Sequence, residues 1–339
     1  MSESDDSDNI PAESVDNDDE NIGTQIVKAV VGGVINAPAW AQKAVLKVAE
    51  RLVLPYTDIP KAWAEGIAGQ VRARNEARAT ITLEATKLLV NNPQENPVAA
   101  RAMAREASKI FREQVNLEDI VSIAAKKVEK EASGNSPPNE VSDDWLNSFE
   151  REASTKSSEE MKEVFGRILA GEILNPGAFS IRAVRLISSL STRDATSLRN
   201  LFGLATFVGF GYLDVNVGVA AGQNGLKDYG LSYGNLTELV ALGVISSDLN
   251  SEWRVPKVDQ GRAVHFAIKY GGNDFVLIKR FDPEKDTAEL KLQGVLLTAL
   301  GAELAKIVEP FYHENYTTAL RNTLTELSCE LVPLVSTKN

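Results

Sequence analysis

A short linker divides this chain, and it constrains the fold more than any other feature of the sequence. The run Gly134-Asn135-Ser136-Pro137-Pro138 is made of residues that interrupt both helices and strands. The 339 residues are enough for two or three compact units around it. We therefore expect a helical N-terminal region over 24–132, a linker over 133–140 and a separate C-terminal region.

The segment 26–53 carries an apolar helical face that is interrupted near Pro38. Val31 and Ile35 lie on this face. Such a face must be covered, because exposing it to water costs about 25 cal/mol per Å². We expect it to be covered by its own domain or by a second copy of the chain. A membrane surface is the alternative.

Three further helices are expected before the linker. Residues 61–90 are rich in Ala, Arg and Glu, which is typical of a long helix in contact with solvent. A helix over 97–114 begins at Pro97, a residue that suits the first helical position. Another helix over 117–132 is expected to have Asn116 as its N-cap.

After the linker, the sequence predicts a helical bundle over 141–207. Helix starts are indicated by serine caps and capping-box spacing at Ser142, at Ser157 with Glu160 and at Ser191 with Asp194. Four apolar residues at helical spacing are expected to form the core, namely Trp145, Phe149, Phe165 and Leu169.

The remaining region, 208–335, is expected to form an α+β unit. Two alternating segments flank Gly271-Gly272-Asn273-Asp274, which predicts a hairpin over 263–281. Two helices and a strand are expected to follow, over 297–308, 314–328 and 330–334. The fold class expected for the whole chain is therefore mainly α with a small α+β C-terminal part, for which a winged-helix variant is one arrangement.

The net charge of −11 is concentrated in an N-terminal tail. Residues 1–20 hold nine acidic residues and no basic residue, so the other 38 acidic residues nearly balance the 36 basic ones. A segment with this charge and so few apolar residues cannot offset the entropy lost on ordering. We expect residues 1–23 to form a disordered acidic tail that aids solubility, with competition against nucleic acid for a basic surface as the alternative.

Residues with catalytic or metal-binding chemistry are few. The chain has two histidines, His265 and His313, and one cysteine, Cys329, whereas zinc sites usually draw four ligands from these residue types. No nucleotide-binding glycine pattern occurs. We expect structural or surface roles for the histidines and a core position for Cys329. We predict no catalytic, cofactor-binding or metal-binding residue, no small-molecule ligand and no enzymatic activity.

The cysteine content also bears on the compartment. A lone cysteine forms no disulfide within the chain, which suits a reducing environment. No signal-peptide pattern occurs, and no apolar run reaches the roughly 18–20 residues of a membrane span. We therefore expect a cytoplasmic protein.

Five blocks occur in order along 116–310. They are Asn116-Leu117-Glu118-Asp119-Ile120-Val121, Val141-Ser142-Asp143-Asp144-Trp145-Leu146, Gly166-Arg167-Ile168-Leu169-Ala170-Gly171-Glu172-Ile173, Pro176-Gly177-Ala178-Phe179-Ser180-Ile181-Arg182 and Leu297-Thr298-Ala299-Leu300-Gly301-Ala302-Glu303-Leu304. In sequence and separation they resemble the bacterial family known as domain of unknown function 2806. Physically, Glu172 is placed to accept backbone N–H bonds from the turn after Asn175, or to pair with Arg167.

The resemblance implies no established activity. The layout is also similar to that of the abortive-infection alpha proteins of phage defence, which join a helical Leu-Ala block to a late Leu-Thr-x-x-Gly segment. We expect a non-enzymatic interaction protein that binds a protein partner or itself, in a phage-defence or stress context. The alternatives are a membrane-active effector that uses the amphipathic segment 26–53 and a nucleic-acid binder that uses the hairpin 263–281 as a wing.

Overall fold

The computed structural model describes residues 36–53, 97–133, 139–209, 211–255, 259–260, 262–281 and 290–334. Contacts divide the chain into two compact units, residues 1–133 and 134–339. Several expectations fall outside the described residues: the tail over 1–23, the part of the first apolar segment before residue 36, the helix over 61–90 and the centre of the linker.

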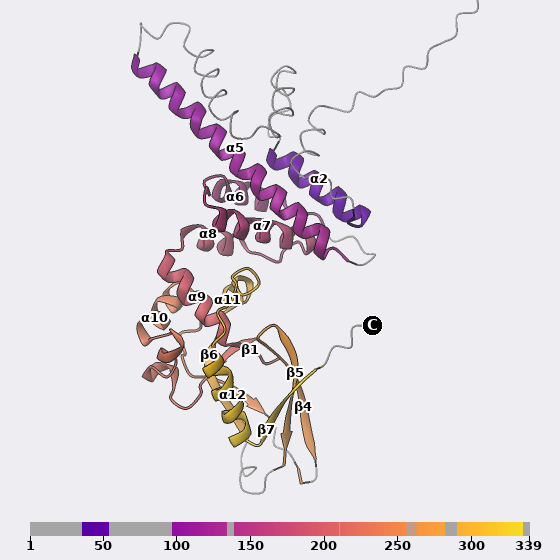
Figure 1. The fold of residues 1–339 in the computed structure, drawn as a ribbon, viewed down its shortest axis with the longest axis vertical. Helices are drawn as coiled ribbons and strands as arrows, with labels where there is room; N and C mark the ends of the chain where they lie inside the picture. The colour runs from indigo at the N-terminus through magenta and orange to yellow at the C-terminus, as the bar shows by residue number, and fades with distance from the viewer. Residues whose placement is uncertain are drawn as a thin grey trace, which may run out of the picture. The chain divides into compact units, whose positions relative to one another are not determined.

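The first unit is described through two helices, α2 (Ala39–Val53) and α5 (Pro97–Glu131), which pack along one another (Figure 1). The Gln114 amide donates to the Val53 carbonyl at 2.9 Å, and the Asn36 amide donates to Glu129 at 3.2 Å. These two contacts make α2 antiparallel to the C-terminal half of α5. The apolar residues that the pair buries are Ala41, Val45, Val48, Ala49, Leu52, Val53, Leu117, Ile120, Val121, Ala124, Ala125 and Val128.

Helix α5 corrects the expectation of two helices separated at Asn116. It runs unbroken for 35 residues from Pro97, which is its first residue as expected. Neither Gly nor Pro occurs between residues 98 and 131, so nothing interrupts the backbone hydrogen bonds. Asn116 lies buried in the middle of the helix instead of capping its start.

The second unit opens with four helices, α6 (Asp143–Ala153), α7 (Glu159–Leu174), α8 (Ile181–Ser189) and α9 (Thr192–Leu204). The predicted core is confirmed, because the four residues Trp145, Phe149, Phe165 and Leu169 are all buried. The Trp145 and Phe149 rings stack with centroids 5.0 Å apart, and Phe149 lies 5.6 Å from Phe165. These contacts join α6 to α7.

The helix caps agree with the sequence in two places and differ in a third. The capping box of Ser191 with Asp194 is present at α9. Ser142 occupies the N-cap position of α6, but its side chain accepts no capping hydrogen bond. The box predicted for Ser157 with Glu160 is wrong by one residue, since Ser158 caps α7 by accepting from the Met161 N–H. Ser157 and Ser158 are adjacent, and either could cap a helix that starts here. The position of the apolar face of α7 favours a start at Glu159, which makes Ser158 the cap.

A seven-stranded antiparallel sheet follows, with the strand order β3-β6-β2-β1-β4-β5-β7. Its strands are β1 (Ala205–Phe207), β2 (Tyr212–Val215), β3 (Ser251–Val255), β4 (Ala263–Tyr270), β5 (Asn273–Arg280), β6 (Leu290–Leu296) and β7 (Cys329–Pro333). Between them lie the short helices η1 (Ala221–Gln223) and η2 (Lys227–Tyr229), and the α-helices α10 (Tyr233–Ala241), α11 (Ala299–Leu304) and α12 (Glu314–Glu326).

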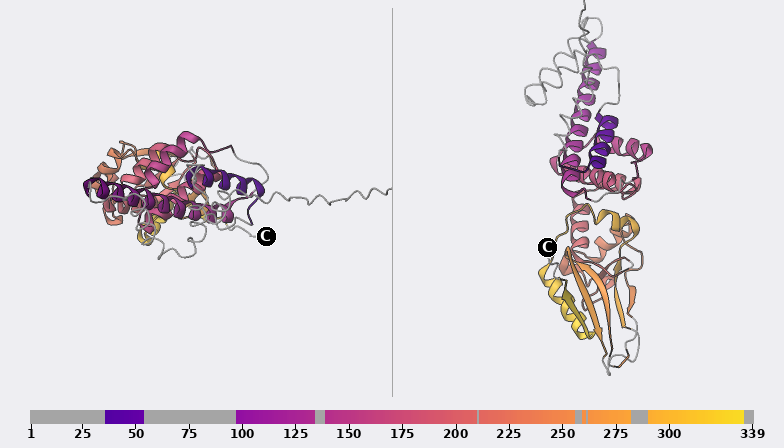
Figure 2. Two further views of the ribbon diagram at one scale, coloured as in Figure 1. Left: turned by 90° about the horizontal axis from the view of Figure 1, so that it is seen from above. Right: turned by 90° about the vertical axis from the view of Figure 1, so that its right-hand side faces the viewer.

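The sheet is strongly curled. Three strands separate β3 from β4 in the strand order, which corresponds to about 19 Å in a flat sheet. The Trp253 ring on β3 nevertheless lies 5.3 Å from the Phe266 ring on β4. Helix α12 lies along the face of the sheet near β5 and β7, as Figures 1 and 2 show. Its buried residues Tyr316, Leu320 and Leu324 face the sheet core.

The sheet overturns the expected fold class. The chain is not mainly α with a small winged-helix-like α+β part, because strands between residues 205 and 333 form one seven-stranded sheet. The hairpin over 263–281 does form, as β4 and β5, with Gly271 and Gly272 at positive φ in its turn. It is not a wing, since β1 pairs with β4 on one side and β7 with β5 on the other.

Candidate interaction site

The residues first considered for their chemistry lie on three different elements. His265 is exposed on β4, whereas His313 is the N-cap residue of α12 and its ring lies 4.9 Å from the Phe311 ring. Cys329 is buried on β7, as expected for a core residue. Among the described residues, no group of three or more His, Cys, Asp and Glu side chains could hold a metal ion.

Glu172, at the end of α7, has the structural role that its position indicates. Its side chain accepts hydrogen bonds from the backbone N–H groups of Gly177 at 2.6 Å and Phe179 at 3.1 Å. Burial raises the pKa of Glu172, and these backbone donors oppose the rise. Arg167 does not pair with Glu172 but binds Glu309 at 2.6 Å.

The turn that Glu172 holds is the point where the last four of the five sequence blocks meet. The Trp145 indole donates to the Phe179 carbonyl at 2.7 Å, and a Cβ atom on Gly171 would lie 2.5 Å from the Phe179 ring. Glu303, from the last block, accepts from the backbone N–H and hydroxyl of Ser180 at 2.7 and 2.8 Å. The blocks therefore build a junction between α6, α7, α8 and α11. Every polar group named in it is engaged within the protein, so the junction is structural.

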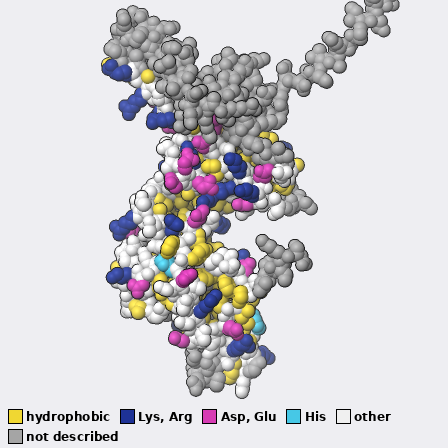
Figure 3. Space-filling view, in the orientation of Figure 1, with side chains coloured by type: hydrophobic (Ala, Val, Ile, Leu, Met, Phe, Trp, Pro, Cys, Tyr) yellow, Lys and Arg dark blue, Asp and Glu magenta, His cyan; other side chains and the backbone are white. Residues whose placement is uncertain are grey.

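A pair of exposed aromatic residues lies elsewhere, on the loop between α11 and α12. We call residues 305–313 the aromatic loop. Phe311 is 51% exposed and Tyr312 is 47% exposed. Large exposed apolar side chains that adjoin one another are typical of a surface that binds a partner. Figure 3 shows apolar side chains at the surface of the second unit among scattered charges of both signs.

The backbone of the aromatic loop is held at several points. Arg167 donates to the Ile307 carbonyl at 2.9 Å and pairs with the Glu309 side chain. Arg199 on α9 donates to the Glu309 carbonyl at 3.3 Å and accepts from the Phe311 N–H at 2.8 Å through its own carbonyl. Two arginines from neighbouring helices therefore fix the segment that presents the aromatic pair.

Close packing adds a further restraint. A Cβ atom on Gly203, near the end of α9, would clash with the backbone carbonyl of Phe311. Only a residue without a side chain allows the aromatic loop to approach α9 this closely. The loop is therefore rigid although its aromatic side chains are exposed.

A buried polar cluster lies next to the start of α12. The Tyr316 hydroxyl donates to the Val215 carbonyl at 2.9 Å, a group that β1 does not reach because its pairing with β2 stops at Asp214. Asp214 is fully buried, and neither of its oxygens accepts a hydrogen bond from a described residue. Burial raises the pKa of Asp214 well above its usual value. Burial is also the main cause of the raised pKa of Tyr270 and of Tyr316, and the nearby Asp214 carboxyl adds to both.

Sequence reasoning missed the aromatic loop. Phe311 and Tyr312 follow Pro310 between two predicted helices, in a chain with only 6% aromatic residues. The available signal was that two adjacent aromatic residues lie in a turn, outside the apolar face of either predicted helix. Their exposure, however, depends on contacts with α7 and α9, more than 100 residues earlier in the chain.

Together, these features define the class of protein: a helical bundle followed by a curled antiparallel sheet. The polar groups of the junction between α6, α7, α8 and α11 are hydrogen-bonded within the protein, and the aromatic loop is exposed. The chain belongs to the family described as protein of unknown function (DUF2806), whose sequence profile matches residues 100–321. This finding confirms the resemblance drawn from the blocks. Searches of curated proteins and of solved structures return no match. In the part of the chain that the structure describes, no helix is long and apolar enough to cross a membrane.

Proposed function

We propose that this chain is a non-enzymatic interaction protein and that the aromatic loop binds a protein partner. The observation that carries the proposal is the exposure of Phe311 and Tyr312 on a backbone that is already fixed. Aromatic residues supply much of the binding energy at protein interfaces. A surface that is rigid before binding loses little conformational entropy when a partner arrives.

The two earlier alternatives find less support. The membrane reading depends on the apolar face of 26–53, and the described part of that segment, α2, packs on α5 and buries Val45, Val48 and Leu52. The nucleic-acid reading depended on a wing, but β4 and β5 are internal strands of the sheet. The basic residues Lys269 and Arg280 on this hairpin pair with Asp274 and Glu330.

The cellular context is a further part of the proposal. The layout shared with the abortive-infection alpha proteins favours a partner met during phage defence or stress. A cytoplasmic location fits that context and the single cysteine. A chromosomal neighbourhood without defence genes in most genomes that encode the family would count against this context.

Site-specific photo-cross-linking in the producing cell tests the interaction. A benzophenone amino acid is introduced at Tyr312, and at Arg254 on β3 as a control whose side chain is 63% exposed. We expect one dominant adduct from position 312 and none from position 254. Its mass distinguishes a second copy of the chain from another protein.

A second substitution makes the assay specific to the loop. Phe311→Ser removes the neighbouring ring at an exposed position, so the melting temperature should change little. The adduct from position 312 should fall at least fivefold in this background. Equal adducts from both positions, or an adduct that does not depend on Phe311, would show that the aromatic loop is not an interface.

A further inference from the structure

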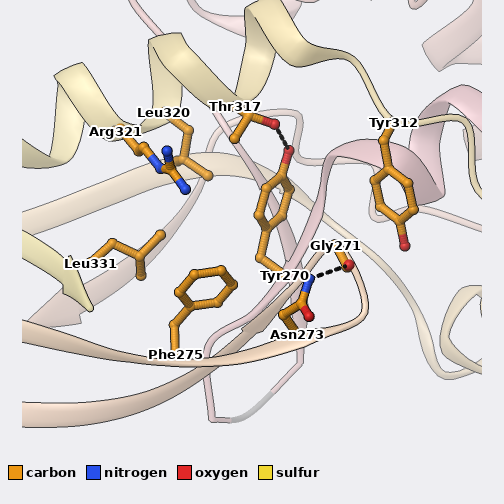
Figure 4. A pocket seen from close by; sticks show the side chains of 9 residues that line it. All are labelled: Tyr270, Gly271, Asn273, Phe275, Tyr312, Thr317, Leu320, Arg321 and Leu331. Atoms are coloured by element: carbon orange, nitrogen blue, oxygen red, sulfur yellow. Dashed lines mark hydrogen bonds between the residues drawn. The ribbon is translucent and has the colours of Figure 1, made fainter. Parts of the chain in front are cut away.

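A pocket of about 220 Å³ opens between α12 and the turn of the β4–β5 hairpin (Figure 4). Its walls include the rings of Tyr270, Phe275 and Tyr312 and the side chain of Leu331. The pocket is therefore lined by aromatic and polar groups in nearly equal measure and has a size that suits a small organic molecule.

One charged side chain is among the residues that line this pocket. Arg321 is the charged residue among those that line it, and Figure 4 shows its guanidinium reaching from α12 toward the space above Phe275 and Leu331. No carboxylate among the described residues pairs with Arg321. In contrast, Arg280 on β5 pairs with Glu330 at 3.1 Å. An unpaired guanidinium beside apolar walls is complementary to an anion.

Two hydroxyls beside the rings are already engaged with each other. The Thr317 hydroxyl donates to the His313 carbonyl at 3.2 Å, and it also lies 2.8 Å from the Tyr270 hydroxyl. Since Thr317 has a single proton, Tyr270 is the donor of the second bond. The Tyr270 hydroxyl therefore has no proton to offer a ligand, whereas Arg321 offers charged N–H donors.

We propose that this pocket binds a small organic acid, with a carboxylate carried on a flat apolar body. The carboxylate accepts two parallel N–H bonds from Arg321, and the body lies against the rings of Tyr270 and Phe275. This site adds a small-molecule ligand, which the sequence alone did not indicate. It does not depend on the protein interface proposed above, although Tyr312 borders both.

Isothermal titration calorimetry of the full chain with 3-phenylpropionate tests the site, with 3-phenylpropionamide as the uncharged probe. We expect saturable binding of the acid and at least tenfold weaker binding of the amide. Arg321→Gln should weaken acid binding at least tenfold. Arg321→Lys should give an intermediate affinity, because it keeps the charge but loses the two-pronged geometry.

Arg280→Gln is the control, since it removes an arginine from β5, the strand that carries Phe275, at a position outside the pocket lining. It should bind the acid as the unsubstituted chain does. The proposal is wrong if the acid does not saturate, if the amide binds equally well, or if Arg321→Gln leaves the affinity unchanged while Arg280→Gln lowers it. Any of these results would leave the cross-linking test of the aromatic loop unaffected.

Discussion

The Glu303 carboxylate caps the backbone of Ser180, with Oε2 lying 2.7 Å from the Ser180 nitrogen and 2.8 Å from its hydroxyl oxygen. The two residues are 123 positions apart in the chain. Ser180 is itself the N-cap of α8, where its hydroxyl accepts from the Ala183 N–H. One glutamate on α11 therefore orients the cap of a helix from the preceding bundle.

Glu303→Ala should destabilise the second unit by about 1 kcal/mol, because two charge-assisted bonds at a solvent-exposed position are lost. Glu303→Gln should cost less, since its amide oxygen still accepts. Urea unfolding measures both values. Glu106→Ala on α5 is the control, because its exposed side chain should change the free energy of unfolding by less than about 0.5 kcal/mol. Equal losses at positions 303 and 106 would show that the cap contributes nothing.

Two phenylalanines distinguish the core from the proposed interface. Phe165 is fully buried between α6 and α7, so Phe165→Ala should cost about 3–5 kcal/mol. Phe311 is half exposed, and Phe311→Ala should cost less than about 1 kcal/mol. Thermal or urea melts of the two variants give the comparison. A Phe165→Ala variant as stable as the unsubstituted chain would contradict the core assignment.

The helical bundle was predictable because each of its helices carries its own signals. Trp145 and Phe149 fall at helical spacing on α6, and the box of Ser191 with Asp194 is complete within four residues. Local patterns of this kind survive folding because tertiary contacts reinforce them. The role of Glu172 was also accessible, since its partners Gly177 and Phe179 lie within seven residues.

The sheet was not predictable by the same reasoning. Strand β1 has three residues and β2 has four, which is too short to show an alternating pattern. The helical region expected over 141–207 ends at Leu204, because the next three residues pair with Tyr212–Asp214. The aromatic loop and the pocket could not be predicted from the sequence for a related reason, since both depend on contacts between segments that are distant in sequence.

Asp214 should make the stability of the protein depend on pH in a defined direction. Its pKa is raised in the folded state relative to 3.8, the ordinary value that the unfolded chain keeps. Below that value the carboxyl is neutral in both states and carries no penalty. As pH rises above it, the unfolded chain ionises first, so stability falls by about 1.4 kcal/mol per pH unit until the folded group ionises as well.

Asp214→Asn removes this titration. The free energy of unfolding of the variant, measured by urea titration between pH 4 and pH 8, should fall less with rising pH than that of the unsubstituted chain. The quantity to compare is the slope of the free energy of unfolding against pH. The absolute values also differ, because burying the Asn amide has a cost that does not change with pH. Glu172 also has a raised pKa, but it is present in both proteins, so its contribution to the pH dependence cancels in the comparison. Parallel curves would show that Asp214 is ionised in the folded state with a partner.

Gly203 offers the sharpest test of the rigid aromatic loop, because its two possible effects have opposite signs. Replacing a helical glycine by Ala stabilises a protein by up to about 1 kcal/mol where there is room for the added methyl group. At Gly203 the added methyl group would clash with the Phe311 backbone carbonyl, and relieving such a clash typically costs about 1–3 kcal/mol. Gly203→Ala should therefore destabilise the protein.

Gly234→Ala on α10 is the matched control, because a Cβ atom there would meet nothing closer than the Ser232 hydroxyl at 3.8 Å. This variant should be neutral or more stable in a thermal melt, whereas Gly203→Ala should melt lower. Moving the Phe311 backbone should also displace Tyr312, so the photo-cross-link from position 312 should weaken in the Gly203→Ala background and persist in Gly234→Ala. If both alanines stabilise the protein equally, α9 does not hold the aromatic loop, and the argument that the loop is fixed before binding fails with it.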